Sequence, residues 1–164
     1  MIPPLLIGGG VLLVSLLCYG VATALVVQVV VRMIRSGHAG PGFWNNVLVM
    51  AIVTLITTAM HLTQIALWAV ILLAFGELSS FEQAFYLSAQ NYTALGYGDV
   101  VLPERWRLLG PFEAINGLLL FALSTAVLFA VMSRLITNRL RHLFGQRGEE
   151  KLPEALGLES RVVP

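Results

Sequence analysis

Residues 93–99 of this 164-residue chain read Thr-Ala-Leu-Gly-Tyr-Gly-Asp, and the rest of the sequence is best interpreted from this heptapeptide outward. Two glycines flank one tyrosine, so the backbone can alternate between negative and positive φ, which glycine adopts freely. Such alternation can aim successive carbonyl oxygens in one direction. A column of carbonyls, repeated around a symmetry axis, can replace the hydration shell of a cation.

The residues before the heptapeptide predict a short helix over 81–92. This segment is mostly apolar and too short to cross a membrane. Its start fits a capping box twice, over residues 79–82 and 80–83. The helix would direct the partial negative charge of its C-terminus toward the same axis, which also favours a cation. A short apolar helix between two longer apolar runs indicates a re-entrant hairpin, because irregular backbone at membrane depth needs protein or water to satisfy it.

The composition indicates that a lipid bilayer is the solvent. Hydrophobic residues make up 57% of the chain and charged residues only 12%, against about 25% in soluble domains. Three runs are long enough for transmembrane helices: about Pro4–Val31, Val47–Phe75 and Pro111–Leu135. The first run is about twice as long as the apolar core of a signal peptide, and we interpret it as a retained span. The predicted fold class is therefore an all-α membrane protein with three transmembrane helices, a re-entrant helix and a loop.

The arrangement of basic residues predicts the domain division and the orientation. We expect an N-terminal helix and loop over 1–43, a unit of two spans and the short helix over 44–138, and a solvated tail over 139–164. The positive-inside rule then places the N-terminus outside and the C-terminus in the cytoplasm of a multi-pass cell-membrane protein. The basic residues that decide this are Arg32, Arg35, Arg134, Arg139, Arg141 and Arg147 on the inner side, against Arg105 and Arg107 on the outer side.

The heptapeptide resembles the selectivity-filter signature of the potassium channels, T-x-V-G-Y-G-D. The resemblance covers about Phe81 to Leu135, in the family's order of pore helix, filter and inner helix. It implies a small prokaryotic two-span "ion channel" with one extra N-terminal span. The function implied is a pore-forming subunit of a potassium-selective channel, most simply a homotetramer, that conducts potassium passively. The implied ion-binding filter is Thr93, Ala94, Leu95, Gly96, Tyr97, Gly98 and Asp99, with potassium at the carbonyls of Ala94, Leu95, Gly96 and Tyr97.

Two positions depart from the family pattern. Ala94 stands where the family has a threonine whose hydroxyl lines the innermost ion site, and Leu95 stands where valine is usual. The missing hydroxyl leaves a weakly selective cation channel as an alternative. A non-conducting membrane sensor or assembly subunit with a vestigial filter is the alternative from another class, and the intact Gly96, Gly98 and Asp99 argue against it.

Polar residues inside the second span form one helix face, with His61, Gln64 and Trp68 at spacings of three and four. An intramembrane histidine is a candidate pH-sensitive group. The other interpretation, which we favour, is hydrogen bonding between helices, because glutamine and threonine neighbours supply partners.

The third span carries a second polar stripe. Glu113, Asn116 and Ser124 are expected either to line the cavity below the filter or to brace the pore helix. Gly117 is interpreted equally as a gating hinge or as a site of close helix packing. By the same resemblance, Gln90 is expected to bond toward Tyr97 or Asp99 behind the filter.

The remaining expectations concern the start of the short helix, catalytic motifs and partners. Glu82 is expected to cap the pore helix. No phosphate loop, nucleophile elbow or Cys/His cluster is present, so the sequence does not favour an enzyme. We expect membrane lipids and further copies of the chain as partners, no nucleic acid, no small-molecule substrate, and no cofactor apart from the permeant potassium ion.

Overall fold

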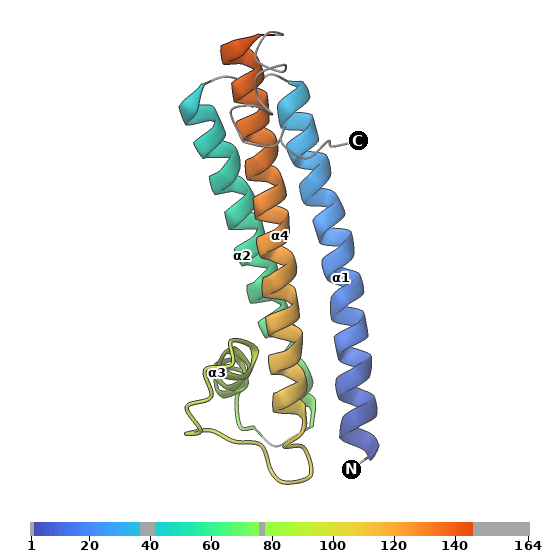
Figure 1. The fold of residues 1–164 in the computed structure, drawn as a ribbon. Helices are drawn as coiled ribbons and strands as arrows, with labels where there is room; N and C mark the ends of the chain where they lie inside the picture. The colour runs from blue at the N-terminus through green and yellow to red at the C-terminus, as the bar shows by residue number, and fades with distance from the viewer. Residues whose placement is uncertain (1, 37–41, 76–77, 146–164) are drawn as a thin grey trace, which may run out of the picture.

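The computed structural model describes residues 2–36, 42–75 and 78–145, and all the regular secondary structure in these ranges is helical. The helices are α1 (Ile2–Arg35), α2 (Phe43–Ala74), α3 (Phe81–Tyr92) and α4 (Leu109–Phe144). α1, α2 and α4 run side by side, and α3 lies with its following loop at one end of the bundle (Figure 1). α1 and α4 point the same way and α2 points the opposite way, so the N-terminus shares the end that holds α3.

Three of the helices are long and apolar enough to span a membrane, as predicted: Pro3–Arg35, Phe43–Ala74 and Leu109–Arg141. α1 and α4 extend beyond the predicted apolar runs at both ends, whereas α2 begins four residues earlier and ends one residue earlier than predicted. A helix elongates readily once it has nucleated, so it can continue into polar flanks. The largest extension is in α4, which continues nine residues past Leu135 to Phe144 and so includes the start of the predicted tail. The rest of that tail, residues 146–164, lies outside the described residues.

Three buried clusters hold the long helices together. At the end away from α3, Val30 of α1, Val53 of α2 and Val131 of α4 pack in one cluster. In the middle, Trp68 of α2 and Leu120 of α4 pack with Tyr19 and Tyr92. A third cluster joins α2 to α3 and to the loop before α4. The short helix is therefore part of the core and has a fixed position relative to the spans.

α3 begins where the sequence predicted, but a different residue completes the cap. Ser80 is the N-cap, and its Oγ accepts a hydrogen bond from the backbone N–H of Gln83. The Oε1 atom of Gln83 in turn accepts from the backbone N–H and the hydroxyl of Ser79. The capping role expected of Glu82 thus belongs to Gln83. Glu82 is exposed in the first turn, where a negative charge interacts favourably with the helix dipole.

Candidate functional site

The candidate site begins where α3 ends, in a Schellman motif. The backbone N–H of Leu95 donates to the carbonyl of Gln90, and the N–H of Ala94 donates to the carbonyl of Asn91. This pair of bonds satisfies carbonyls that a helix end would otherwise leave unpaired. The motif requires a left-handed residue after the C-cap Thr93, and Ala94 takes that role with φ 57°. Glycine is the usual choice there, so Ala94 holds a strained conformation.

Positive φ then recurs at every second residue. Gly96 has φ 59° and Gly98 has φ 76°, so with Ala94 the left-handed conformation occurs at positions 94, 96 and 98. The positive φ expected at Gly96 is confirmed, and the one at Ala94 was not foreseen. All seven residues 93–99 are exposed in the single chain. The exposed fraction is 55% for Leu95 and 69% for Tyr97. The loop therefore has a regular backbone pattern but no cover from its own chain.

Asp99 ties the far end of this loop back to α3. Its Oδ2 accepts a hydrogen bond from the Tyr86 hydroxyl at 2.7 Å, and its Oδ1 accepts from the Gln90 side-chain amide at 2.9 Å. Of the two partners expected for Gln90, it is therefore Asp99 that bonds to it. The Tyr86 bond first, and then the Gln90 bond, lower the pKa of Asp99 from its ordinary value. Because Tyr86 and Gln90 precede the end of α3, the loop must return along the helix.

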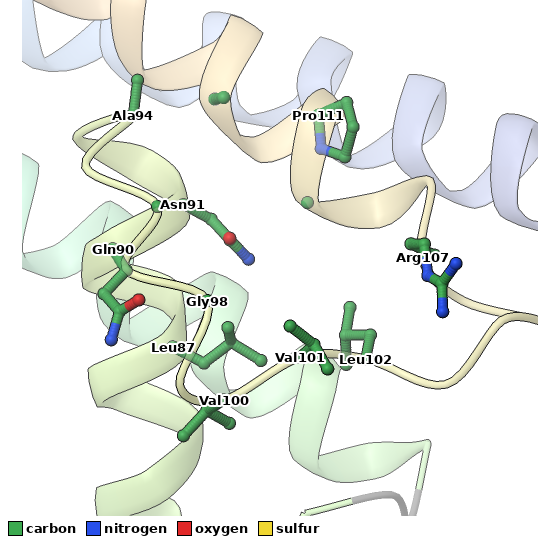
Figure 2. Close-up of a pocket in the computed structure, with 13 residues that line it drawn as sticks. Leu87, Gln90, Asn91, Ala94, Gly98, Val100, Val101, Leu102, Arg107 and Pro111 are labelled. Carbon is green, nitrogen blue, oxygen red and sulfur yellow. The ribbon is translucent and has the colours of Figure 1, made fainter.

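A hollow of about 370 Å³ lies between this returning loop and the first turns of α4. Figure 2 shows Gln90 and Asn91 from α3, Gly98 and Val101 from the loop and Pro111 from α4 around it. Its lining is mostly apolar, and Ala94 lies at one end. The loop is thus supported by α3 along one side and separated from α4 along the other.

Glu113 of α4 braces α3 from behind. Its carboxyl group is fully buried and contacts the Ser88 hydroxyl through Oε1, while Oε2 accepts from the Asn91 side-chain amide at 3.1 Å. The Ser88 hydroxyl also donates to the carbonyl of Ile65 in α2. A hydroxyl has one proton, so these bonds are all satisfied together when Glu113 carries a proton and donates it to Ser88. Of the two roles expected for Glu113, the structure supports the brace.

Gly117 allows α4 to approach the end of α3 closely. A Cβ atom built at this position would overlap the carbonyl oxygen of Tyr92. Only glycine fits this approach, as expected from the packing interpretation. α4 is one continuous helix through this point, and a hinge at Gly117 stays a prediction.

His61 connects all four helices. Its Nδ1 lies 2.9 Å from the hydroxyl of Tyr92 in α3, and its Nε2 lies 2.8 Å from the hydroxyl of Ser124 in α4. The Tyr19 hydroxyl of α1 lies 2.7 Å from the same Ser124 oxygen, and Ser124 also donates to the carbonyl of Leu120. The hydrogen bonding between helices predicted for His61 is confirmed.

The donors and acceptors of this network balance in one arrangement. The Ser124 hydroxyl donates its only proton to the carbonyl of Leu120. Its oxygen therefore accepts hydrogen bonds from the Tyr19 hydroxyl and from an N–H at Nε2 of His61. Nδ1 of the neutral ring is then an acceptor and receives the proton of Tyr92. A doubly protonated ring would leave the Tyr92 hydroxyl without an acceptor among these groups. The bonding pattern therefore assigns the tautomer with its proton on Nε2.

The other predicted polar residues are buried in the same layer. Gln64 donates through Nε2 to the carbonyl of Ser15 at 3.4 Å, which joins α2 to α1. Trp68 packs in the central cluster with Tyr19, Tyr92 and Leu120. Asn116 is fully buried in α4, so neither it nor Ser124 faces an open cavity within the chain.

Several residues of the site were missed by the sequence analysis. Tyr86, Ser88 and Asn91 lie on α3, where they contact Asp99 or Glu113. Tyr86 could have been found, because it precedes Gln90 by one helical turn and so shares its face. The link from Tyr19 and Tyr92 to His61 depends on helix packing and has no comparable local signal.

Comparison with known proteins finds a family match that includes the candidate site. The family model described as "Ion channel" matches residues 56–134, a segment that includes most of α2, all of α3, the loop and most of α4. No curated protein and no solved structure is matched by the chain. The three candidate spans and the family match support a membrane protein. Over residues 56–134, slightly less than half of the chain, the sequence is similar to the ion channel family.

Proposed function

We propose that the chain is the pore-forming subunit of a potassium-selective channel, with residues 93–99 as a re-entrant selectivity filter. The observation that carries the proposal is the left-handed backbone at positions 94, 96 and 98, directly after the C-terminus of α3. Alternating conformations of this kind can aim the carbonyls of residues 94–97 toward one axis, where they replace the hydration shell of potassium. The negative end of α3 adds a favourable potential for a cation.

The functional unit is a symmetric homo-oligomer, most simply a tetramer. One chain supplies one loop, whereas a closed ring of carbonyls needs several. The exposure of residues 93–99 in the single chain supports this, because irregular backbone at membrane depth requires cover from protein or from pore water. Neighbouring copies would provide that cover.

The filter would lie toward the outer face of the cell membrane. Arg32 and Arg35 of α1 lie at the same end of the bundle as Arg139 and Arg141 of α4, opposite α3. The positive-inside rule makes this basic end cytoplasmic. In a Cys18→Ser background, a cysteine at Val101 should react with an impermeant reagent from outside, whereas a cysteine at Gly145 should need permeabilisation. Reversed labelling would contradict the orientation.

Substitution of Gly96 tests the filter assignment. A Cβ at Gly96 meets no atom within 4 Å in the chain, so the effect of a side chain there is conformational. Left-handed backbone costs an alanine roughly 1–2 kcal/mol and a β-branched residue more, in every subunit. We expect Gly96→Ala to reduce potassium flux into liposomes and Gly96→Val to abolish it.

The matched control is Gly20→Val in α1, where a Cβ also meets no atom within 4 Å and φ is not positive. This variant should insert and conduct as the unmodified protein does. Full flux through Gly96→Val would refute the assignment of residues 93–99 as the filter.

A weakly selective cation channel is the second candidate, and Ala94 is the observation that favours it. A methyl group stands where a hydroxyl could add oxygen ligands at the innermost site. Ala94→Thr and Ala94→Val add side chains of similar shape at φ 57°, so both add similar backbone strain. A higher preference for potassium over sodium in the threonine variant alone would isolate the effect of the hydroxyl. Equal selectivity in the two variants would place residue 94 away from the ion path.

A further inference from the structure

A groove of about 390 Å³ lies between α1 and α4, far from the candidate filter. Its walls are aliphatic, with Val27 and Val31 on α1 and Val127 and Ala130 on α4. Two basic residues, Arg35 and Arg134, also line the groove. A volume of this size falls in the range of about 300–1,000 Å³ that is typical of small-ligand sites.

The groove lies near the basic ends of the first and third spans. Arg35 is the last residue of α1, and Arg134 lies two turns before Arg141, where the third span ends. The apolar part of the groove extends from these arginines toward the middle of the bundle, over residues 27–34 and 127–131. Its long apolar wall and its charged end therefore match the acyl chain and the headgroup region of one bilayer leaflet.

Within the described residues, no acidic side chain lies at this end of the bundle. The acidic side chains among residues 2–36, 42–75 and 78–145 all lie on α3, in the loop after it or near the start of α4: Glu82, Asp99, Glu104 and Glu113. Arg139, by contrast, lies over the Phe43 ring of α2, 5.8 Å from its centroid, and does not line the groove. Both guanidinium groups carry a fixed positive charge, so an anion is a complementary ligand for a groove lined by Arg35 and Arg134.

We propose that this groove binds an anionic phospholipid, with an acyl chain against the valines and the phosphate hydrogen-bonded by Arg35 and Arg134. Guanidinium groups suit this role because their planar array of donors matches phosphate oxygens. Basic pockets between transmembrane helices bind anionic headgroups for the same reason. Another copy of the chain is a poorer occupant, because its own basic end would face these arginines in a parallel assembly and like charges repel.

The lipid site requires that the chain is inserted in a membrane, but it does not require that residues 93–99 form a selectivity filter. Binding can therefore be measured separately from ion flux. The purified full-length oligomer would be titrated with phosphatidylglycerol and with phosphatidylcholine of identical acyl chains, and bound lipids counted by native mass spectrometry. We expect the unmodified protein to prefer phosphatidylglycerol, and Arg35→Gln and Arg134→Gln each to weaken its binding about fivefold.

Two further variants distinguish a specific lipid site from a general surface potential and from a contact between subunits. Arg139→Gln removes the same charge at the same end of α4 and should leave the preference for phosphatidylglycerol unchanged. Ala130→Phe keeps every charge but fills the groove, and should weaken binding of both lipids. If Arg139→Gln and Arg134→Gln weaken phosphatidylglycerol binding equally, the proposal is overturned in favour of a general surface potential. Dissociation of subunits by Ala130→Phe, with lipid binding intact, would identify the groove as a contact between copies.

Discussion

The Nδ1 atom of His61 lies 2.9 Å from the hydroxyl of Tyr92, and this contact joins the middle of α2 to the last turn of α3, immediately before the candidate filter. The other ring nitrogen of His61 binds Ser124 of α4, which also binds Tyr19 of α1. The position of the candidate filter therefore depends on hydrogen bonds that reach all three long helices, including the N-terminal helix outside the family match.

The first prediction compares two tyrosines of this network. Tyr92→Phe should lower the free energy of unfolding by roughly 1 kcal/mol, because it leaves Nδ1 of buried His61 without a donor. Tyr19→Phe should cost less, since Ser124 keeps its bond from His61. Thermal unfolding of the two purified variants in detergent measures the difference. A Tyr92→Phe protein as stable as the unmodified protein would show that the His61–Tyr92 bond contributes nothing.

The second prediction concerns the protonation of Glu113. Glu113→Gln should leave stability and flux nearly unchanged, because an amide can donate to Ser88 and accept from Asn91 as a protonated carboxyl does. Glu113→Ala should destabilise the protein by about 1–3 kcal/mol, since it leaves buried polar partners unpaired. If Glu113→Gln is as damaging as Glu113→Ala, the buried group acts as a charged carboxylate and the assignment of its proton is wrong.

The third prediction uses two glycines that differ only in their surroundings. Gly117→Ala should destabilise the protein by about 1–3 kcal/mol and impair conduction, because the added methyl group overlaps the Tyr92 carbonyl. Gly20→Ala in α1 meets no atom within 4 Å and should be neutral or stabilising by up to about 1 kcal/mol. Unfolding temperatures and flux are measured together. A Gly117→Ala protein of normal stability that fails only to open would instead support the hinge.

The fourth prediction is a pH dependence at Asp99. Its hydrogen bonds favour the ionised carboxylate and lower its pKa below the ordinary 3.8. The stabilisation they provide is therefore fully present above about pH 4 and is lost as the pH falls through the lowered pKa. Tyr86→Phe removes the hydrogen bond that contributes most to the lowered pKa of Asp99. The acid transition should therefore occur at a higher pH in this variant. Carboxyl NMR titration detects the shift, and an unchanged Asp99 titration in Tyr86→Phe would contradict it.

The elements of the fold were predictable because their signals are local. Runs of apolar residues identified the three spans, and the serines at 79 and 80 placed the start of α3 correctly. The helix ends were less predictable: α4 continues to Phe144 because nothing in residues 136–144 stops a helix before Gly145, which has φ 60°. Ala94 shows another limit, since its positive φ follows from hydrogen bonds to α3 and not from its residue type.

The candidate site was predictable only in part. The heptapeptide and the face shared by Gln90 and Tyr86 are readable from the sequence, whereas the role of Glu113 depends on where α4 meets α3. The same holds for Tyr19, which reaches Ser124 across 105 residues of sequence. Such contacts are set by the packing of whole helices, and no spacing within one helix reveals them.

The central claim is that residues 93–99 form a potassium-selective filter, and the reversal potential of the purified protein in a planar bilayer tests it most directly. With potassium on one side and sodium at equal concentration on the other, a potassium-selective pore should show a reversal potential displaced strongly toward the potassium equilibrium potential. The displacement should disappear together with the current in Gly96→Val. A reversal potential near zero with robust current would contradict potassium selectivity and establish the weakly selective channel. The absence of any current from correctly assembled protein would contradict a conducting pore.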